Sequence, residues 1–307
     1  MPKVSVIIAT RNRCALLPRA IESALRAGSD VEIVVVDDAS EDQTPAVCAN
    51  YVDQVRYVRL QRRLGIGGVR NVGLISSTAP YIAFLDDDDL RLPGTLDKQV
   101  ELLDAAPGAG MIYGKALYGN EQCEPAGGSY PDVCPRDDLF WQLLVWNFIP
   151  SPTVVFRRAC VTRLGLIEED APGVEDWDLW VRIAEVYPVL ALDEPVAIWR
   201  QPTRTSDQFT SRGEELHRLA QRLQREKWLK LPRAIEAGAA RRREIARAFA
   251  RRAAQQLLWE GAANLKSKQF RQFARVALAS ARLHPIGAGK IILSQPFSSK
   301  PHEDRLL

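Results

Sequence analysis

The sequence predicts an α/β protein with a Rossmann-like, mostly parallel mixed sheet flanked by helices, followed by a C-terminal all-helical extension. Two observations support this fold class. In residues 1–210, short apolar runs that suit buried strands alternate with helical patterns, as in parallel sheets with right-handed crossovers. After about residue 210 the strand patterns stop, and amphipathic helical patterns continue alone.

Charge divides the chain at the same place. The 307 residues suffice for two domains, and their net charge of +3 conceals an asymmetry. Residues 1–210 carry 20 Lys and Arg against 30 Asp and Glu, whereas residues 211–290 carry 19 against 6. We therefore predict a first domain over 1–210, a basic helical region over 211–290 and a poorly ordered tail over 291–307.

The bulk composition argues against several classes of protein. No apolar run reaches the roughly 18 residues of a bilayer span, and a strand pattern begins at Val4, where a secretory signal would lie. The five cysteines are widely spaced and form no CxxC pair, so neither a disulfide framework nor a zinc site is indicated. We expect a cytoplasmic protein, with peripheral contact at the inner face of the membrane left open.

The first 90 residues predict a regular alternation of elements. An apolar run at 4–9 is typical of a buried parallel strand, and Pro18 suits the first turn of the helix that follows. The predicted order is a strand over 4–9, a helix over 16–25, a strand over 32–36, a helix over 44–51, a strand over 55–60, a helix from Gly65 and a strand over 81–85.

Three of these strands end in polar clusters, at 10–13, 37–40 and 86–89. In open α/β sheets, ligands bind just beyond the carboxyl ends of the strands. We therefore expect all three clusters to meet at one crevice.

The cluster Asp86–Asp89 places four carboxylates directly after a buried strand. Such a run is electrostatically costly unless a cation lies nearby, and Mg²⁺ or Mn²⁺ prefers carboxylate, phosphate and water oxygens. The alternative is a polar junction in which Asp89 caps the next helix. No Lys or Arg lies within the run, which favours the metal.

Three other residues each allow two interpretations. Asp38 could accept hydrogen bonds from a ribose or base, or it could cap a turn. Arg70, in the first turn of a Gly-rich helix, could offset phosphate charge or be a surface arginine. Asp176 lies between Glu175 and Trp177, where low polarity could raise its pKa and suit a general base; the alternative is an ordinary helix start with core tryptophans.

The remainder of the chain is less regular. The predicted elements are a strand over 111–113, a polar loop over 119–135, a helix over 138–149, a strand over 153–156, a helix over 173–183 and short strands over 188–192 and 196–199. Three amphipathic helices follow, over 216–223, 245–257 and 270–281, with a turn at 261–267 that would join the last two as a helical hairpin. Their basic faces are either solvated or directed at lipid head groups; no motif supports nucleic-acid binding.

Five motifs, in this order along the chain, give it a resemblance to a known family. They are VSVIIATRNR from Val4, VVVDDAS from Val34, GGVRNVG from Gly67, FLDDDD from Phe84 and EDWDLW from Glu175. Each motif is modestly specific, and together they resemble the family 2 glycosyltransferases of GT-A fold over about residues 3–200. The resemblance implies an enzyme that moves one sugar from a nucleotide-diphosphate sugar to an acceptor hydroxyl, with inversion.

The resemblance also implies roles for single residues. Asp176 would be the catalytic base, and a divalent cation, Mn²⁺ or Mg²⁺, would bind Asp88 with Asp86 beside it. The donor would be a UDP-, dTDP- or GDP-sugar, and the acceptor a saccharide or a lipid-linked molecule in cell-surface polysaccharide or glycoconjugate synthesis. The residues implied to contact or support the donor are Thr10, Arg13, Asp38, Arg70, Asp86 and Asp87.

Two departures qualify this expectation. Where related chains carry a Tyr-Arg-x-His element, this one has Trp199-Arg200-Gln201-Pro202, so no histidine joins the metal. The Gln-x-x-Arg-Trp element of processive synthases is also absent, which favours transfer of a single sugar. A homodimer is left open.

Two alternatives compete with this function. A nucleotidyltransferase of sugar-nucleotide synthesis would carry a glycine-rich loop after the first strand, and the turn at 10–13 has no glycine. A non-catalytic nucleotide-sugar-binding or scaffold protein would have no need of Asp86, Asp88 and Asp176 together.

Overall fold

A computed structural model of the chain describes residues 1–201 and 212–266, together with residues 278 and 280. Contacts divide the chain into two units. The first contains Met1–Leu139 and Phe148–Ser206, and the second contains Phe140–Asn147 and Asp207–Leu307. The predicted boundary at residue 210 lies outside the described residues and stays a prediction, as do the tail and most of the third amphipathic helix.

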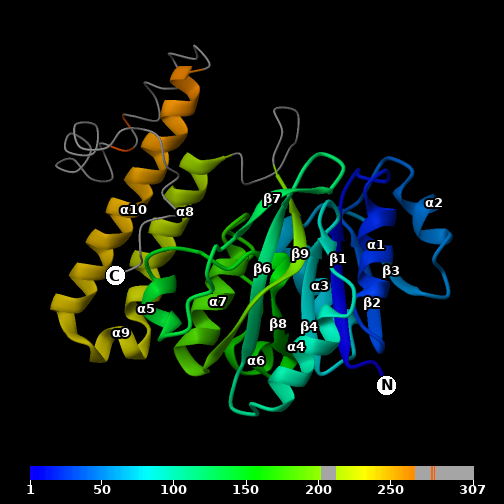
Figure 1. Ribbon diagram of the computed structural model, residues 1–307, viewed down its shortest axis with the longest axis horizontal. Coiled ribbons are helices and arrows are strands. Elements are labelled where there is room, and N and C mark those ends of the chain that lie inside the picture. Colours follow the sequence, from blue (N-terminus) through cyan, green and yellow to red (C-terminus); the bar gives the residue numbers. More distant parts are fainter. Residues whose placement is uncertain (202–211, 267–277, 279, 281–307) are drawn as a thin grey trace. The chain divides into compact units, whose positions relative to one another are not determined.

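The described part of the first unit is built on one mixed sheet with the strand order β3-β2-β1-β4-β8-β6-β9-β5, and β7 pairs with β6 (Figure 1). The pairs among β1 to β4 are parallel, β8 is antiparallel to both its neighbours, and β6 is parallel to β9. The strands are β1 (Val4–Thr10), β2 (Val31–Asp37), β3 (Val55–Arg59), β4 (Tyr81–Asp86), β5 (Leu90–Arg91), β6 (Met111–Gly119), β7 (Pro125–Tyr130), β8 (Val155–Arg157) and β9 (Val189–Arg200).

Helices cover both faces of this sheet. One face packs on the first and fourth helices through a buried aliphatic cluster that includes Val6, Leu85 and Leu96. The opposite face packs Phe84 and Phe156 against Trp180 of the seventh helix, with ring centroids 5.4 to 6.3 Å apart. The helices of this unit are α1 (Leu17–Arg26), α2 (Thr44–Ala49), α3 (Gly65–Ser76), α4 (Thr95–Asp104), α6 (Arg158–Leu164) and α7 (Glu175–Val186), with a 3₁₀ turn η1 (Ser151–Thr153).

Helix α3 approaches the sheet closely because of one glycine. A Cβ atom at Gly73 would clash with the side chain of Ile7 on β1. A residue without a side chain is therefore needed where this helix crosses the strand.

The structure confirms the predicted elements of the first 90 residues and corrects later ones. The loop expected over 119–135 contains β7, whose mostly exposed sequence PAGGSY has no apolar alternation that could have revealed a strand. The two short strands expected over 188–192 and 196–199 form the single strand β9. It stays continuous because irregular pairing opposite Tyr113 and Lys115 of β6 accommodates Pro195.

The described part of the second unit is helical. Its core contains Trp228, Phe249 and Leu257. Its elements are α5 (Leu139–Leu143), whose first residue belongs to the first unit, α8 (Gly213–Glu226), the 3₁₀ turn η3 (Trp228–Lys230), α9 (Pro232–Glu236) and α10 (Gly238–Lys266).

Two helical expectations for this part of the chain are wrong in extent. The helix expected over 138–149 ends at Leu143, because the chain returns to the first unit at Phe148. The turn expected at 261–267 is wrong as far as Lys266, because α10 continues through it. A single glycine at 261 costs a helix only about 1 kcal/mol relative to alanine, and the neighbouring alanines favour helix.

No helix among the described residues has both the length and the apolar character to cross a membrane.

Candidate active site

The three polar clusters at the strand ends lie together, as predicted. Beyond β1 and β2, the backbone N–H of Asp38 donates to the carbonyl of Thr10 over 2.9 Å. Beyond β1 and β4, Arg13 donates from Nη1 to Asp87 Oδ1 over 2.8 Å. These contacts join residues up to 74 positions apart at the carboxyl edge of the parallel strands, where α/β sheets bind ligands.

Arginines from other elements neutralise the acidic run. Arg13 Nη1 lies 2.9 Å from Asp88 Oδ2, and Arg200 Nη1 lies 3.4 Å from the same oxygen. No Lys or Arg lies within the run itself; these guanidinium groups come from the turn after β1 and from the end of β9. Their positive charges offset part of the negative charge of the four carboxylates.

Asp89 does not cap the following helix. Its Oδ1 accepts the backbone N–H of Arg200 over 2.9 Å, and α4 begins after Gly94 without a side-chain cap. Its contact with Arg200 helps hold the end of β9 against the acidic run.

Burial shapes the protonation of the acidic run. It raises the pKa of Asp87 to about 7, opposed by the charge of Arg13 and increased by that of Asp88. Burial also raises the pKa of Asp88, and it raises the pKa of Asp89 well above its ordinary value. The protonation state of these three carboxyl groups therefore depends on what binds beside them, because a bound cation would favour their ionised forms.

Arg70 is buried and joins two acidic groups that lie far apart in the sequence. Its Nη2 lies 2.8 Å from Asp86 Oδ1, and its Nη1 lies 2.8 Å from Glu175 Oε1. The guanidinium carbon also lies 5.0 Å from the centroid of the Phe84 ring. With 3% of its side chain exposed, Arg70 is not a surface arginine.

Asp176 lies in the first turn of α7, next to this ion pair. Burial raises its pKa to about 7; the charge of Glu175 adds to the shift and that of Arg70 opposes it. Trp177 and Trp180 are both buried, so the tryptophans belong to the core. A half-buried carboxylate with a pKa near neutrality is suited to accept a proton at physiological pH.

The two predicted base-contacting residues differ in their surroundings. The Asp38 carboxylate accepts the backbone N–H groups of Leu64 over 2.7 Å and Gly65 over 3.1 Å, and thereby caps the start of α3. The buried hydroxyl of Thr10 lies near enough to Asp87 to lower the pKa of that carboxyl, but it has no hydrogen bond of normal geometry among the described residues. Thr10 can therefore turn its hydroxyl to a ligand, while the base contact of Asp38 stays a prediction.

The side chains fit a cation only as part of a larger ligand set. Among the described residues, no group of three or more His, Cys, Asp and Glu side chains is arranged to hold a metal ion. Asp86 and Asp88 have suitable oxygen donors, but guanidinium groups contact both. They fit a Mg²⁺ or Mn²⁺ ion that takes its other ligands from phosphate and water.

Two residues that contact the site, Glu175 and Arg200, were not among the predicted site residues. Glu175 is the buried partner of Arg70, and the acidic pair it forms with Asp176 was a visible signal for it. Arg200 was visible only as part of a motif that lacks its histidine. Its contact with Asp88 depends on the pairing of β9 with β5 and could not be read from spacing.

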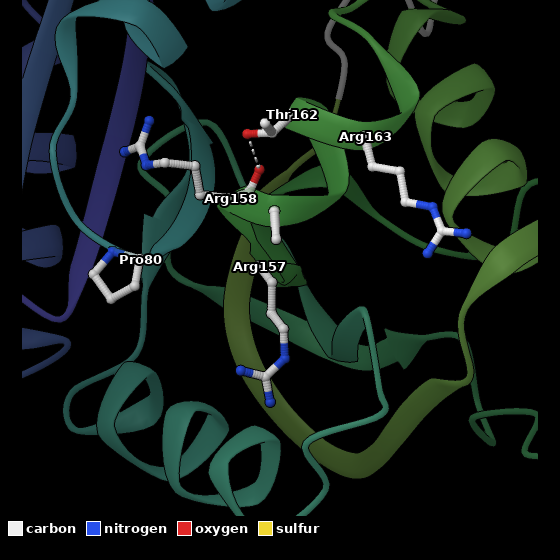
Figure 2. Close-up of a pocket in the computed structure, with 6 residues that line it drawn as sticks. Pro80, Arg157, Arg158, Thr162 and Arg163 are labelled. Atoms are coloured by element: carbon white, nitrogen blue, oxygen red, sulfur yellow. Dashed lines mark hydrogen bonds between the residues drawn. The ribbon is translucent and has the colours of Figure 1, made fainter.

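A shallow pocket on the same unit has a structural explanation. Three arginines line it, Arg157, Arg158 and Arg163, and Figure 2 shows their side chains diverging. Arg157 Nη2 donates to the carbonyl of Leu103 over 2.6 Å, and Arg158 Nη1 donates to that of Leu74 over 2.9 Å. These two arginines satisfy carbonyl groups near the C-terminal ends of α4 and α3.

Comparison with known proteins places this site in a family. The family described as Glycosyl transferase family 2 matches residues 5–161, just over half of the chain, from β1 into α6. This chain belongs to glycosyl transferase family 2. The predicted family and the α/β fold class are thereby confirmed.

Relatives of this family 2 member include one protein named for succinoglycan biosynthesis and several uncharacterized glycosyltransferases. The succinoglycan biosynthesis protein ExoO of Rhizobium meliloti is 44% identical over 108 residues, which are 34% of this chain and 31% of that protein. An uncharacterized glycosyltransferase of Rickettsia felis is 31% identical over 208 residues, which are 64% of this chain and 34% of that protein. The chain thus spans about a third of the length of these two relatives.

Solved structures share the fold. The S. aureus TarS structure in complex with UDP-GlcNAc has a TM-score of 0.65 at 18% identity, covering 94% of this chain and 83% of that one. The mannosyltransferase PcManGT from Pyrobaculum calidifontis, in complex with GDP-Man and Mn²⁺, has a TM-score of 0.59 at 20% identity, covering 96% and 82%. At these identities the likeness concerns the fold alone.

Proposed function

We propose that this family 2 member transfers one sugar from a nucleotide-diphosphate sugar to an acceptor hydroxyl, with inversion at the anomeric carbon. The observation that carries the proposal is the buried Arg70, which joins Asp86 at the end of β4 to Glu175 beside Asp176. One ion-pair network thus connects a carboxylate at the ligand-binding edge with Glu175, the neighbour in sequence of Asp176, whose pKa is about 7.

In the proposed reaction, Asp176 accepts the proton of the acceptor hydroxyl. The acceptor oxygen forms a bond to the anomeric carbon while the bond from that carbon to the diphosphate breaks on the opposite face. The leaving nucleoside diphosphate keeps the bonding electrons, and the proton remains on Asp176. General-base catalysis of this kind contributes about 10²- to 10⁴-fold to the rate.

Residues at the ends of three strands would balance the negative charge of the leaving diphosphate. Arg13 follows β1, Arg200 ends β9, and Asp86 and Asp88 would hold a divalent cation. When bound, that cation would supply positive charge beside the diphosphate oxygens. The buried hydroxyl of Thr10 would donate to the nucleotide at the same edge of the sheet.

The proteins that this chain resembles support a class of substrate. The TarS and PcManGT structures contain UDP-GlcNAc and GDP-Man, so we propose a UDP-, GDP- or dTDP-sugar as the donor. ExoO is named for succinoglycan biosynthesis, which supports a saccharide or lipid-linked acceptor in cell-surface polysaccharide synthesis. The reaction would take place in the cytoplasm.

Donor hydrolysis tests the proposal without knowledge of the acceptor. The full chain is incubated with UDP-GlcNAc or GDP-Man and Mn²⁺, and release of the nucleoside diphosphate is measured. We expect Asp176→Asn to lower turnover by about 10²-fold or more while donor affinity is retained, because the amide cannot accept a proton. Full turnover by Asp176→Asn would show that the base is assigned wrongly.

A further inference from the structure

The segment 165–174 connects α6 with α7 and ends two residues before Asp176. Helix α7 begins at Glu175 without a side-chain cap. A helix end that lacks a cap frays unless other contacts hold the chain beside it. The place of Asp176 in the first turn of α7 therefore depends on what holds the segment 165–174.

Asn71 of α3 binds the middle of this segment with its whole side-chain amide. Its Oδ1 accepts the backbone N–H of Ile167 over 2.9 Å, and its Nδ2 donates to the carbonyl of Ile167 over 3.1 Å. The same Nδ2 donates to Glu169 Oε1 over 2.9 Å, so both amide hydrogens are used. Asn71 is only 5% exposed, so loss of its amide would leave the backbone groups of the buried Ile167 unpaired, which is costly.

The shape of α3 fits the same segment one turn before Asn71. A Cβ atom at Gly67 would lie 2.8 Å from the carbonyl oxygen of Glu168 and 2.9 Å from Cα of Glu169. Both are backbone atoms, which cannot rotate away as the end of a side chain can. The backbone of Gly67 is helical, so the space beside it, and not its conformation, requires glycine. The segment therefore lies directly against α3.

The two ends of the segment are held as well. Near its beginning, Arg182 of α7 donates from Nη2 to the carbonyl of Leu166 over 3.0 Å. At its end, Glu175 accepts the backbone N–H of Gly173 and pairs with Arg70 of α3. Two consecutive residues of α3 thus hold the middle of the segment through an amide and its end through a guanidinium group.

We propose that Asn71 is a positioning residue, which holds the segment 165–174 against α3 and thereby keeps the carboxylate of Asp176 in place to accept the proton. A general base must lie within about 2.6–3.2 Å of the atom that gives up its proton, and a misplacement of about 1 Å can cost about 10²-fold in rate. This inference rests on the proposed function and adds a residue that acts on the reaction through the segment.

The division of an effect between kcat and the donor KM tests this role. Release of the nucleoside diphosphate by the full chain is measured with UDP-GlcNAc and with GDP-Man, each with Mn²⁺. We expect Asn71→Ala to lower kcat about tenfold and to leave the donor KM unchanged, because it displaces the base and leaves the proposed donor contacts at the strand ends intact. An unchanged kcat would overturn the proposal.

A double-mutant cycle separates positioning from a general loss of structure. When Asp176→Asn is already present, Asn71→Ala should lower kcat by less than about twofold more, because the carboxylate that the segment positions is gone. A tenfold loss in both backgrounds would overturn the positioning role, since damage elsewhere in the fold multiplies with the loss of the base.

Two further variants keep the test independent of the folding of Asn71→Ala. Gly67→Ala displaces the segment without removing a hydrogen-bonding group, and it should also lower kcat with the donor KM unchanged. Ser77→Ala is the matched control, because it removes a buried hydroxyl that accepts from Arg158 Nη2 over 2.9 Å at the other end of α3. It should leave kcat and KM unchanged. Full turnover by Gly67→Ala, or a tenfold loss in Ser77→Ala, would overturn the proposal.

The outcomes distinguish this inference from the proposed function. If Asp176→Asn loses turnover whereas Asn71→Ala keeps it, the assignment of the base stands and the positioning role fails. If the unaltered chain hydrolyses neither donor, the proposed function is contradicted and this inference falls with it.

Discussion

In the first unit, three arginines of the candidate site contact carboxylates, whereas in the second unit three arginines lie over aromatic rings. At the site, Arg13, Arg70 and Arg200 each have a guanidinium nitrogen within 3.4 Å of a carboxylate oxygen. These pairs hold charge where a charged ligand would bind. The same residue type therefore serves two ends, binding charge in one unit and packing in the other.

In the second unit, three arginines cover rings of the segment 140–147. The same segment is held by Gln224, whose Nε2 donates to the carbonyl of Leu144 over 2.7 Å. The distances from the guanidinium carbon to the ring centroid are 4.7 Å for Arg233 and Phe140, 5.3 Å for Arg241 and Trp141, and 5.1 Å for Arg252 and Trp146.

This difference changes the meaning of the basic composition. Residues 211–290 carry 13 more basic than acidic residues, which by itself suggests an anionic partner. Part of that charge, however, lies over aromatic rings of the unit's own segment. The net charge therefore overstates the number of arginines that a membrane or other partner could reach.

The largest effect is expected from breaking the ion pair of the first unit. Arg70→Met leaves the Glu175 carboxylate buried without its cation, which should lower the free energy of unfolding by about 3–5 kcal/mol. Urea denaturation measures this. The double variant Arg70→Met with Glu175→Gln should regain most of the loss, and an unchanged midpoint in the single variant would contradict the pairing.

A second test asks which arginines of the second unit remain available. Arg243, Arg247 and Arg251 lie at four-residue spacing on α10, are exposed, and have no carboxylate partner among the described residues. If the unit docks on anionic lipid, replacing all three with Gln should weaken binding to phosphatidylserine vesicles at about 1 kcal/mol per residue.

Co-sedimentation with vesicles measures this binding. The matched control is replacement of Arg233, Arg241 and Arg252, which lie over rings, and it should change vesicle binding less. Equal binding by the unaltered chain and the Arg243, Arg247 and Arg251 variant would exclude these arginines as a lipid contact.

The pH profile tests the chemistry of the first unit. In the proposed reaction Asp176 must be ionised to accept a proton, and its pKa is about 7. The rate of transfer should therefore rise with pH through about 7 and fall about tenfold per unit below it. Since the pKa of Asp87 is also about 7, Asp87→Asn is the control. If the pH–rate profile of Asp87→Asn keeps its inflection near pH 7, that inflection belongs to Asp176. If the inflection is lost, it belongs to Asp87.

The smallest effect is expected from one ring contact of the second unit. Arg252→Met should lower the free energy of unfolding by about 0.5–1 kcal/mol, the usual contribution of a cation–π pair near the surface. Arg247→Met, at an exposed position, should change it by less than about 0.5 kcal/mol. Equal effects of the two replacements would remove the contrast between the units.

Much of the first unit follows from local patterns. Continuous apolar runs marked β1, β2 and β4, and each ends in polar residues because the carboxyl edge of a parallel sheet faces the ligand. The β6–β7 hairpin could not be found in this way. Its outer strand is largely exposed, and its sequence PAGGSY has no apolar alternation that would mark a strand.

The sequence by itself determined the family, the order of the first strands and helices, and the carboxylates that the reaction would use, because motifs and periodicity are local properties of the chain. Only the tertiary structure decided how the charges are paired. Arg70 and Glu175 are 105 positions apart, and Arg200 and Asp88 are 112 apart. Side-chain electrostatics act over a few ångströms of space, and sequence spacing does not record which distant residues the sheet brings within that range.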